Sequence, residues 1–88
     1  MVEYEFTPHN VCSRHIHVEL SDDGKIIEDV LFTGGCAGNL SAIRKLVKGK
    51  PTDEVIELLQ GNRCGPRPTS CADQMTRALR EAQELIAR

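Results

Sequence analysis

The sequence predicts an α+β fold, in which a three-stranded antiparallel sheet carries about three helices on one face. Apolar and polar residues alternate in the first third of the chain, which is the period of half-buried strands. After residue 36 the apolar residues recur every three to four positions, which is the period of amphipathic helices. Because 88 residues suffice for only one modest core, we expect a single domain over residues 1–88.

Three strands are expected in the first part of the chain. Residues 2–6 alternate around two glutamates and predict a short strand at a sheet edge. Residues 15–20 place Ile, Val and Leu on one face and His, His and Glu on the other. Asp23-Gly24 indicates a hairpin turn, and the return strand covers residues 25–32. Its alternation slips around residues 28–29, which predicts a bulge.

Three helices are expected after the sheet. The first extends from about Cys36 to Lys48, and the second from Asp53 to Gln60 with Thr52 as its cap. The third covers about Cys71 to Ala87, with Ser70 as N-cap. Its apolar stripe consists of Met75, Ala78, Leu79, Ala82, Leu85 and Ile86.

Composition argues against several classes of partner. The net charge is −2 with acids and bases interspersed, and only three residues are aromatic, so no nucleic-acid or anionic-membrane surface is expected. The first residues are acidic and lack the pattern of a signal peptide, and no apolar run could span a bilayer. We therefore expect a cytoplasmic protein.

Four cysteines form the candidate metal site: Cys12, Cys36, Cys64 and Cys71. All four fall at the ends of expected elements or in loops, where they can meet at one edge of the sheet. In a reducing cytoplasm, cysteines point to metal ligation or redox chemistry more than to disulfides. There is no C-x-x-C pair, so inert buried thiols stay the alternative. Cys12 shares the parity of Ile16, so a regular strand would turn its side chain toward the covered face.

Glycines surround Cys36 at the point where a strand turns into a helix. Gly34, Gly35 and Gly38 permit close approach of another backbone or binding of an anion at the helix start, and we favour the backbone contact. The segment lacks the Lys-Ser/Thr of a P-loop. The helix start also favours a thiolate at Cys36.

Other candidate residues carry weaker signals. His9 lies in a loop and His15 and His17 lie on the polar side of their strand, so we expect them to face solvent. No acid–base pair or Cys–His nucleophile pair can be placed. The sequence therefore assigns no catalytic residue.

Two motifs carry a family resemblance that covers nearly the whole chain. Gly-Gly-Cys-Ala-Gly-Asn-Leu (34–40) and Thr-Ser-Cys-Ala-Asp-Gln (69–74) resemble the TSCPD-domain family in its small, four-cysteine form, with Ala72 in place of proline. Larger relatives carry this domain at the C-terminus of adenosylcobalamin-dependent ribonucleotide reductases. This association implies a nucleotide- or cofactor-binding accessory role as one hypothesis. The chain has no room for a reductase barrel, so that activity is not carried over.

A second resemblance is to the IscU/NifU-type iron–sulfur scaffold, through residues 23–32, 35–36, 46–54 and 70–72. The three scaffold cysteines would correspond to Cys12, Cys36 and Cys71, with Cys64 as an added ligand. Arg14 stands where the scaffold has an aspartate, and the chaperone-docking segment is absent. Because a fourth thiolate closes a tetrahedral site, both departures favour a stable site over cluster transfer.

These observations lead to one main functional hypothesis. We expect a small metal-binding protein in which the four cysteines hold Zn(II), with iron or an iron–sulfur cluster as the alternative. A reversible Cys64–Cys71 disulfide is the redox variant of that alternative. Besides the metal ion, expected partners are a second copy of the chain, a ribonucleotide reductase or an iron–sulfur assembly protein.

Overall fold

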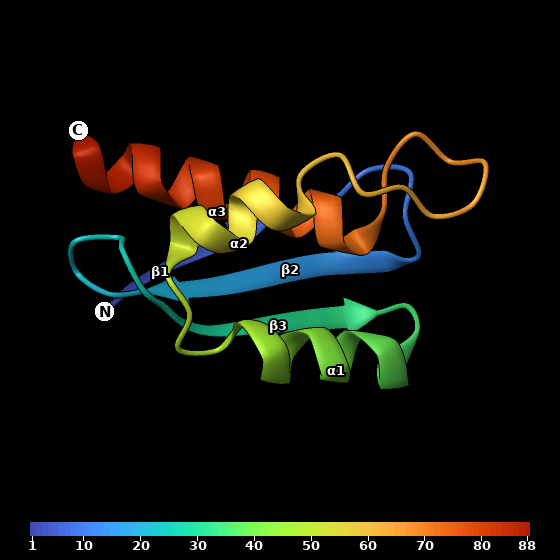
Figure 1. The fold of residues 1–88 in the computed structure, drawn as a ribbon, viewed down its shortest axis with the longest axis horizontal. Coiled ribbons are helices and arrows are strands. Elements are labelled where there is room, and N and C mark those ends of the chain that lie inside the picture. The colour runs from blue at the N-terminus through green and yellow to red at the C-terminus, as the bar shows by residue number, and fades with distance from the viewer.

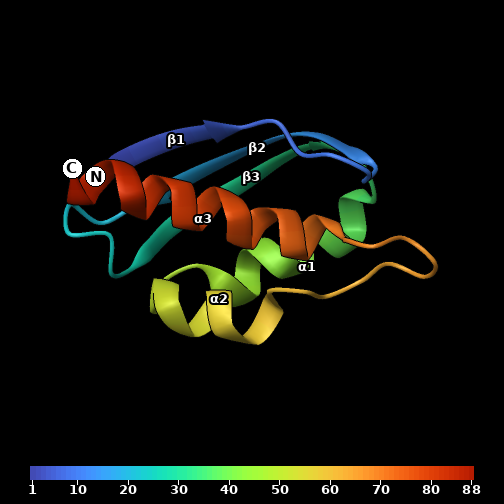
Figure 2. The same cartoon turned by 90° about the horizontal axis from the view of Figure 1, so that it is seen from above.

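The structure, a computed structural model, describes residues 1–88 and has the predicted α+β architecture (Figure 1). In chain order the elements are β1 (Val2–Phe6), β2 (Ser13–Leu20), β3 (Ile27–Gly34), α1 (Ala37–Val47), α2 (Thr52–Leu59) and α3 (Cys71–Ala87). The strands form one antiparallel sheet in the order β1-β2-β3. All three helices lie on the same side of that sheet, and its other face is left open (Figure 2).

Two bulges shape the central strand pair. Between β2 and β3, Glu19 pairs with Asp29 and Leu20 with Ile27, which leaves Glu28 as the extra residue. This irregularity confirms the bulge predicted at residues 28–29. Its effect is to keep apolar residues of β3 on the covered face on both sides of the extra residue.

The second bulge lies at the start of β2 and changes the position of Cys12. Ser13 pairs with Gly34 and His15 with Thr33, so Arg14 is the extra residue. The bulge shifts the alternation by one position, and Ser13 is buried whereas Cys12 is exposed. The parity argument that turned Cys12 toward the covered face was therefore wrong, because it assumed a regular strand up to residue 12.

The core lies between the sheet and the helices. It contains 12 buried residues: Ile16, Val18, Leu20, Ile27, Val30, Val47, Val55, Ile56, Met75, Ala78, Leu79 and Ala82. The predicted stripe of α3 supplies four of them. Leu46, Leu58 and Leu85 lie on the predicted apolar faces but are exposed.

Helix starts agree with the sequence at α3 and differ by one residue at α2. Ser70 caps α3, and its Oγ accepts a hydrogen bond of 3.1 Å from the Asp73 N–H. In α2, Pro51 holds the N-cap position and Thr52 is the first helical residue. Thr52 is buried and its Oγ1 has no hydrogen-bond partner, so it packs in the interior instead of capping.

The chain termini and three of the connections between elements lie at opposite ends of the molecule. The N- and C-termini lie at one end, beside the β2–β3 turn (Figure 1). The β1–β2 loop, the β3–α1 turn and the α2–α3 loop all lie at the other end (Figure 1, Figure 2). These three connections carry Cys12, Cys36 and Cys64, and Cys71 begins α3 directly after the last of them.

Candidate metal centre

The three connections at one end of the molecule bring all four cysteines to one pocket. Cys12 ends the β1–β2 loop, Cys36 lies between β3 and α1, Cys64 lies in the α2–α3 loop, and Cys71 begins α3. The pocket has a volume of about 220 Å³, and its lining includes the four cysteines and Arg63. The prediction that cysteines 59 positions apart meet at one edge of the sheet agrees with this geometry.

The sulfur atoms form one close pair within a looser group. Sγ of Cys12 lies 3.8 Å from Sγ of Cys71, and Oγ of Ser13 lies 3.3 Å from the same Cys71 sulfur. All four cysteines are free thiols, and only Cys71 is half-buried while the others are exposed. No three of the sulfurs lie within 4.8 Å of one another. Coordination by all four would therefore require their loops to close toward the Cys12–Cys71 pair.

A glycine makes room for Cys12 beside the β3–α1 turn. Gly35 has φ +81°, and a Cβ there would lie 3.1 Å from Cys12 Sγ and 3.0 Å from Leu40 Cδ1. Only glycine fits this backbone and this contact without strain. Gly34 also has positive φ and lies against the Arg14 side chain. Gly38, by contrast, lies in α1 with open space around it, and an anion at this helix start stays a prediction.

A buried hydrogen-bond network holds the Cys64 loop to the start of α3. The Asp73 carboxylate accepts hydrogen bonds from the Gly61 N–H at 2.6 Å and from the Thr69 hydroxyl at 2.5 Å. Burial opposes its charge, but the hydrogen bonds from Thr69 and Gly61 outweigh burial and lower the pKa of Asp73. The carboxylate therefore stays ionised and ties both ends of the loop together. The Cys64 N–H also donates to the Thr69 carbonyl at 3.1 Å.

The same network reaches the β1–β2 loop, which carries Cys12. The Gln74 amide donates to Thr69 Oγ1 at 3.0 Å, and its Oε1 accepts from the His9 N–H at 3.1 Å. Gln74 is almost fully buried, and its hydrogen bond to Thr69 is shielded from water, whereas the one from His9 is partly buried. Residues Thr69 to Gln74 thus hold both the loop that carries Cys64 and the loop that carries Cys12 next to Cys71.

The thiols influence one another's ionisation. A hydrogen bond from Cys71, and then one from the Cys36 backbone, lower the pKa of Cys12. The charge of Cys12 is the largest of the effects that raise the pKa of Cys36, and Cys71 and Cys64 add to it. Ionisation of one thiol therefore opposes ionisation of the next, a repulsion that a bound cation would relieve.

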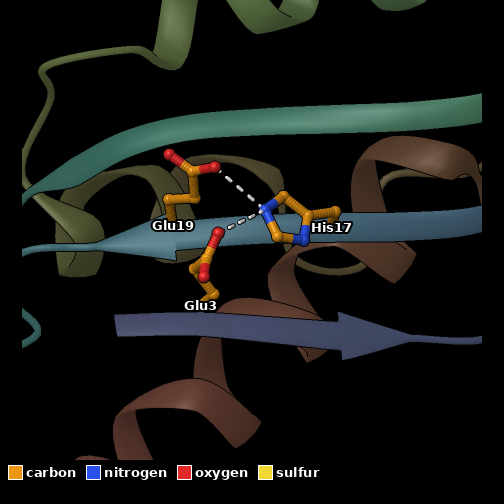
Figure 3. Close-up of side chains that lie close together, drawn as sticks. All are labelled: Glu3, His17 and Glu19. Carbon is orange, nitrogen blue, oxygen red and sulfur yellow. Dashed lines mark hydrogen bonds and ion pairs between the residues drawn. The ribbon is translucent and has the colours of Figure 1, made fainter. Parts of the chain in front are cut away.

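A second group of potential ligands lies on the open face of the sheet and was missed from the sequence. The three side chains are Glu3 on β1 and His17 and Glu19 on β2 (Figure 3). The alternation of both strands placed these residues on polar faces, but the six-residue connection between them does not fix the strand register. The observed register, in which Glu3 pairs with Glu19, brings them together. His9 does not join either group.

Comparison with known proteins assigns the family but adds no near relative. The family model of the TSCPD domain matches residues 1–83. Neither the curated proteins nor the solved structures contain a match to this chain, so the likeness to IscU/NifU-type scaffolds stays a prediction. None of the helices has the length and apolar character needed to cross a membrane. With the match covering all but the last five residues, the chain belongs to the TSCPD-domain family.

Proposed function

We propose that this protein binds one metal ion, preferably Zn(II), through Cys12, Cys36, Cys64 and Cys71. The observation that carries the proposal is the meeting of all four thiols in one pocket, although they come from four separate places in the chain. Soft thiolate donors select Zn(II) or iron over harder ions. A site closed by four thiolates is typical of structural zinc, so the role we propose is stabilisation of this end of the fold.

The spacing of the closest sulfurs supports a tetrahedral site. Two sulfurs bound to one zinc ion at about 2.3 Å with tetrahedral angles are roughly 3.8 Å apart. The Cys12 and Cys71 sulfurs have that separation. They therefore form one edge of the coordination tetrahedron, and Cys36 and Cys64 complete it when their loops close.

Charge balance is compatible with this assignment. Four thiolates and Zn(II) leave a formal charge of about −2. Cys71 is the first residue of α3 and Cys36 directly precedes α1, so the positive ends of two helix dipoles face the site. Arg63 on the pocket wall adds a full positive charge.

The closest competing function is iron–sulfur or redox chemistry at the same thiols. The proximity of Cys12 and Cys71 favours a disulfide between these two over the Cys64–Cys71 disulfide considered from the sequence. A zinc ion and an iron–sulfur cluster would both use the reduced thiols, and we propose the cytoplasm as their compartment, whereas the disulfide forms only when an oxidant removes two electrons from Cys12 and Cys71. They predict different products, so one set of measurements separates them.

The test is metal analysis after anaerobic, reducing purification, with single Cys→Ser variants at the four positions. We expect about one zinc ion per chain, a loss of affinity in each variant, and a Co(II) derivative whose thiolate-to-metal absorption weakens with each cysteine removed. Iron and acid-labile sulfide in place of zinc would instead indicate an iron–sulfur cluster. Metal content far below one per chain, or variants that all bind as well as wild type, would overturn the proposal.

A further inference from the structure

The open face of the sheet carries a second, separate set of metal-ligating side chains. It lies on the side away from the helices and toward the end of β2 that is distant from the cysteines. We propose that Glu3, His17 and Glu19 bind a divalent transition-metal ion with carboxylate and imidazole ligands. This site is independent of the four-cysteine site and does not rest on it.

The donor atoms already have the spacing of a coordinated set. His17 Nε2 lies 2.9 Å from Glu19 Oε2 and 3.6 Å from Glu3 Oε1 (Figure 3). All three donor atoms lie within 4.8 Å of one another. Nitrogen and oxygen ligands at about 2.0–2.2 Å from one ion are roughly 3–4 Å apart, so small side-chain movements suffice.

The orientation of the His17 ring is fixed from its other side. Nδ1 of His17 is hydrogen-bonded to the Glu5 carboxylate, whose second oxygen lies 2.5 Å from His15 Nε2. His17 Nε2 is hydrogen-bonded to Glu19 in the same way, and a bound metal ion would take the place of the Nε2 proton while Nδ1 donates to Glu5. A carboxylate behind a ligating histidine is the usual arrangement around protein-bound metal ions.

The placement of the two glutamates depends on a positive charge between them. Glu3 and Glu19 are directly opposed in the β1–β2 pairing, and like charges in that position destabilise a sheet. Glu19 is also opposed to Asp29 on its other side. His17 is the only basic side chain within ion-pair distance of Glu3 and Glu19, since Arg44 and Lys48 are engaged by Asp29. One imidazole thus faces two carboxylates here, and a divalent ion would balance the second negative charge.

Partial burial strengthens the argument for a bound ion. The side chains of His17 and Glu19 are only 17% and 20% exposed, so water solvates them poorly. One imidazole and two carboxylates suit Mn(II), Fe(II) or Zn(II), and thiolates are poor ligands for Mn(II). Mn(II) therefore distinguishes this site from the cysteines, with the remaining coordination positions filled by water.

The experiment titrates Mn(II) into the reduced, metal-free protein and records paramagnetic broadening in the ¹H–¹⁵N spectrum. We expect residues 3, 17 and 19 to broaden first. His17→Gln, which removes a ligand without removing a carboxylate, and Glu19→Gln should each weaken binding at least tenfold. The matched control is Glu28→Gln, which removes an exposed carboxylate from β3 in the same sheet and should change the affinity less than twofold.

Three results would overturn the proposal: broadening spread over all acidic surfaces, an equal effect of Glu28→Gln, or no Mn(II) binding at millimolar concentration. Circular dichroism first verifies that each variant is folded. Should His17→Gln unfold, Glu3→Gln on the edge strand makes the same comparison. Because the cysteines are far from the broadened residues, failure of the four-cysteine proposal does not affect this result.

Discussion

Asp29 on β3 accepts two hydrogen bonds from the guanidinium of Arg44 on α1, each 2.7 Å long. The pair is bidentate, and it holds α1 against β3, the strand that leads into the Cys36 turn. Hydrogen bonding from Arg44 is the main cause that lowers the pKa of Asp29.

Asp29→Asn should lower the free energy of unfolding by up to about 1 kcal/mol at pH 7, because the Arg44 side chain is 43% exposed and water screens the pair. Because the folded pKa is depressed, this contribution is full above the unfolded pKa of about 3.9 and is lost as the pH falls through the folded pKa. The difference between the two proteins should therefore shrink as the pH falls below the unfolded pKa. Urea titrations of both proteins at pH 7 and at acidic pH measure this difference. Glu84→Gln serves as the control and should leave the free energy of unfolding unchanged at either pH.

Two glycines near Cys36 should respond in opposite directions to alanine. Gly35→Ala should destabilise by at least about 1–2 kcal/mol, because its φ is +81° and its Cβ would collide with Leu40 and Cys12. Gly38→Ala should be neutral or stabilise by up to about 1 kcal/mol, because the position is helical with open space. Thermal unfolding compares the two. Equal effects of both substitutions would contradict the close approach of Cys12 to the turn.

Removing the Asp73 carboxylate should release the Cys64 loop. Asp73→Ala leaves the Gly61 N–H and the Thr69 hydroxyl without their acceptor, which we expect to cost about 2–3 kcal/mol. Amide hydrogen exchange at Gly61 should accelerate more than exchange in β2. The exposed Glu57→Ala serves as control and should leave both quantities unchanged. Wild-type protection at Gly61 in the Asp73 variant would show that the loop is held by other contacts.

The loss of stability on replacing a leucine of α2 or α3 by alanine should depend on how buried its side chain is. Leu79→Ala should lower the free energy of unfolding by about 2–5 kcal/mol, because the side chain is fully buried in the core. Leu58→Ala should change it by less than about 0.5 kcal/mol, because that side chain is 72% exposed. Chemical denaturation of both variants provides the measurement. A large loss for Leu58 would indicate that a partner covers it in solution.

The local elements were largely predictable because periodicity reports which face of each element is covered. The stripe from Met75 to Ala82 defined α3, and the Asp23-Gly24 turn defined the β2–β3 hairpin. The predictions were wrong where a single residue shifts the strand alternation or the helix start by one position. The bulge at Arg14 moved Cys12 to an exposed position, and Pro51 took the cap position expected for Thr52.

Long-range geometry was predictable only where several signals coincided. Four cysteines at element ends pointed to one site, and the pocket contains them all. The Glu3–His17–Glu19 group gave no such signal, because residues 7–12 could join β1 and β2 in more than one register. The role of Gln74 was also hidden, since a buried glutamine cannot be told from a surface one in a helical stripe.

The placement of the chain termini has a practical consequence. Both termini lie at the end of the molecule opposite the cysteine pocket. An affinity tag, a fluorophore or a whole fused protein at either terminus would therefore leave the thiols accessible. Immobilised in this way, the protein would present its sulfur-lined end outward, which suits capture experiments with metal donors or protein partners.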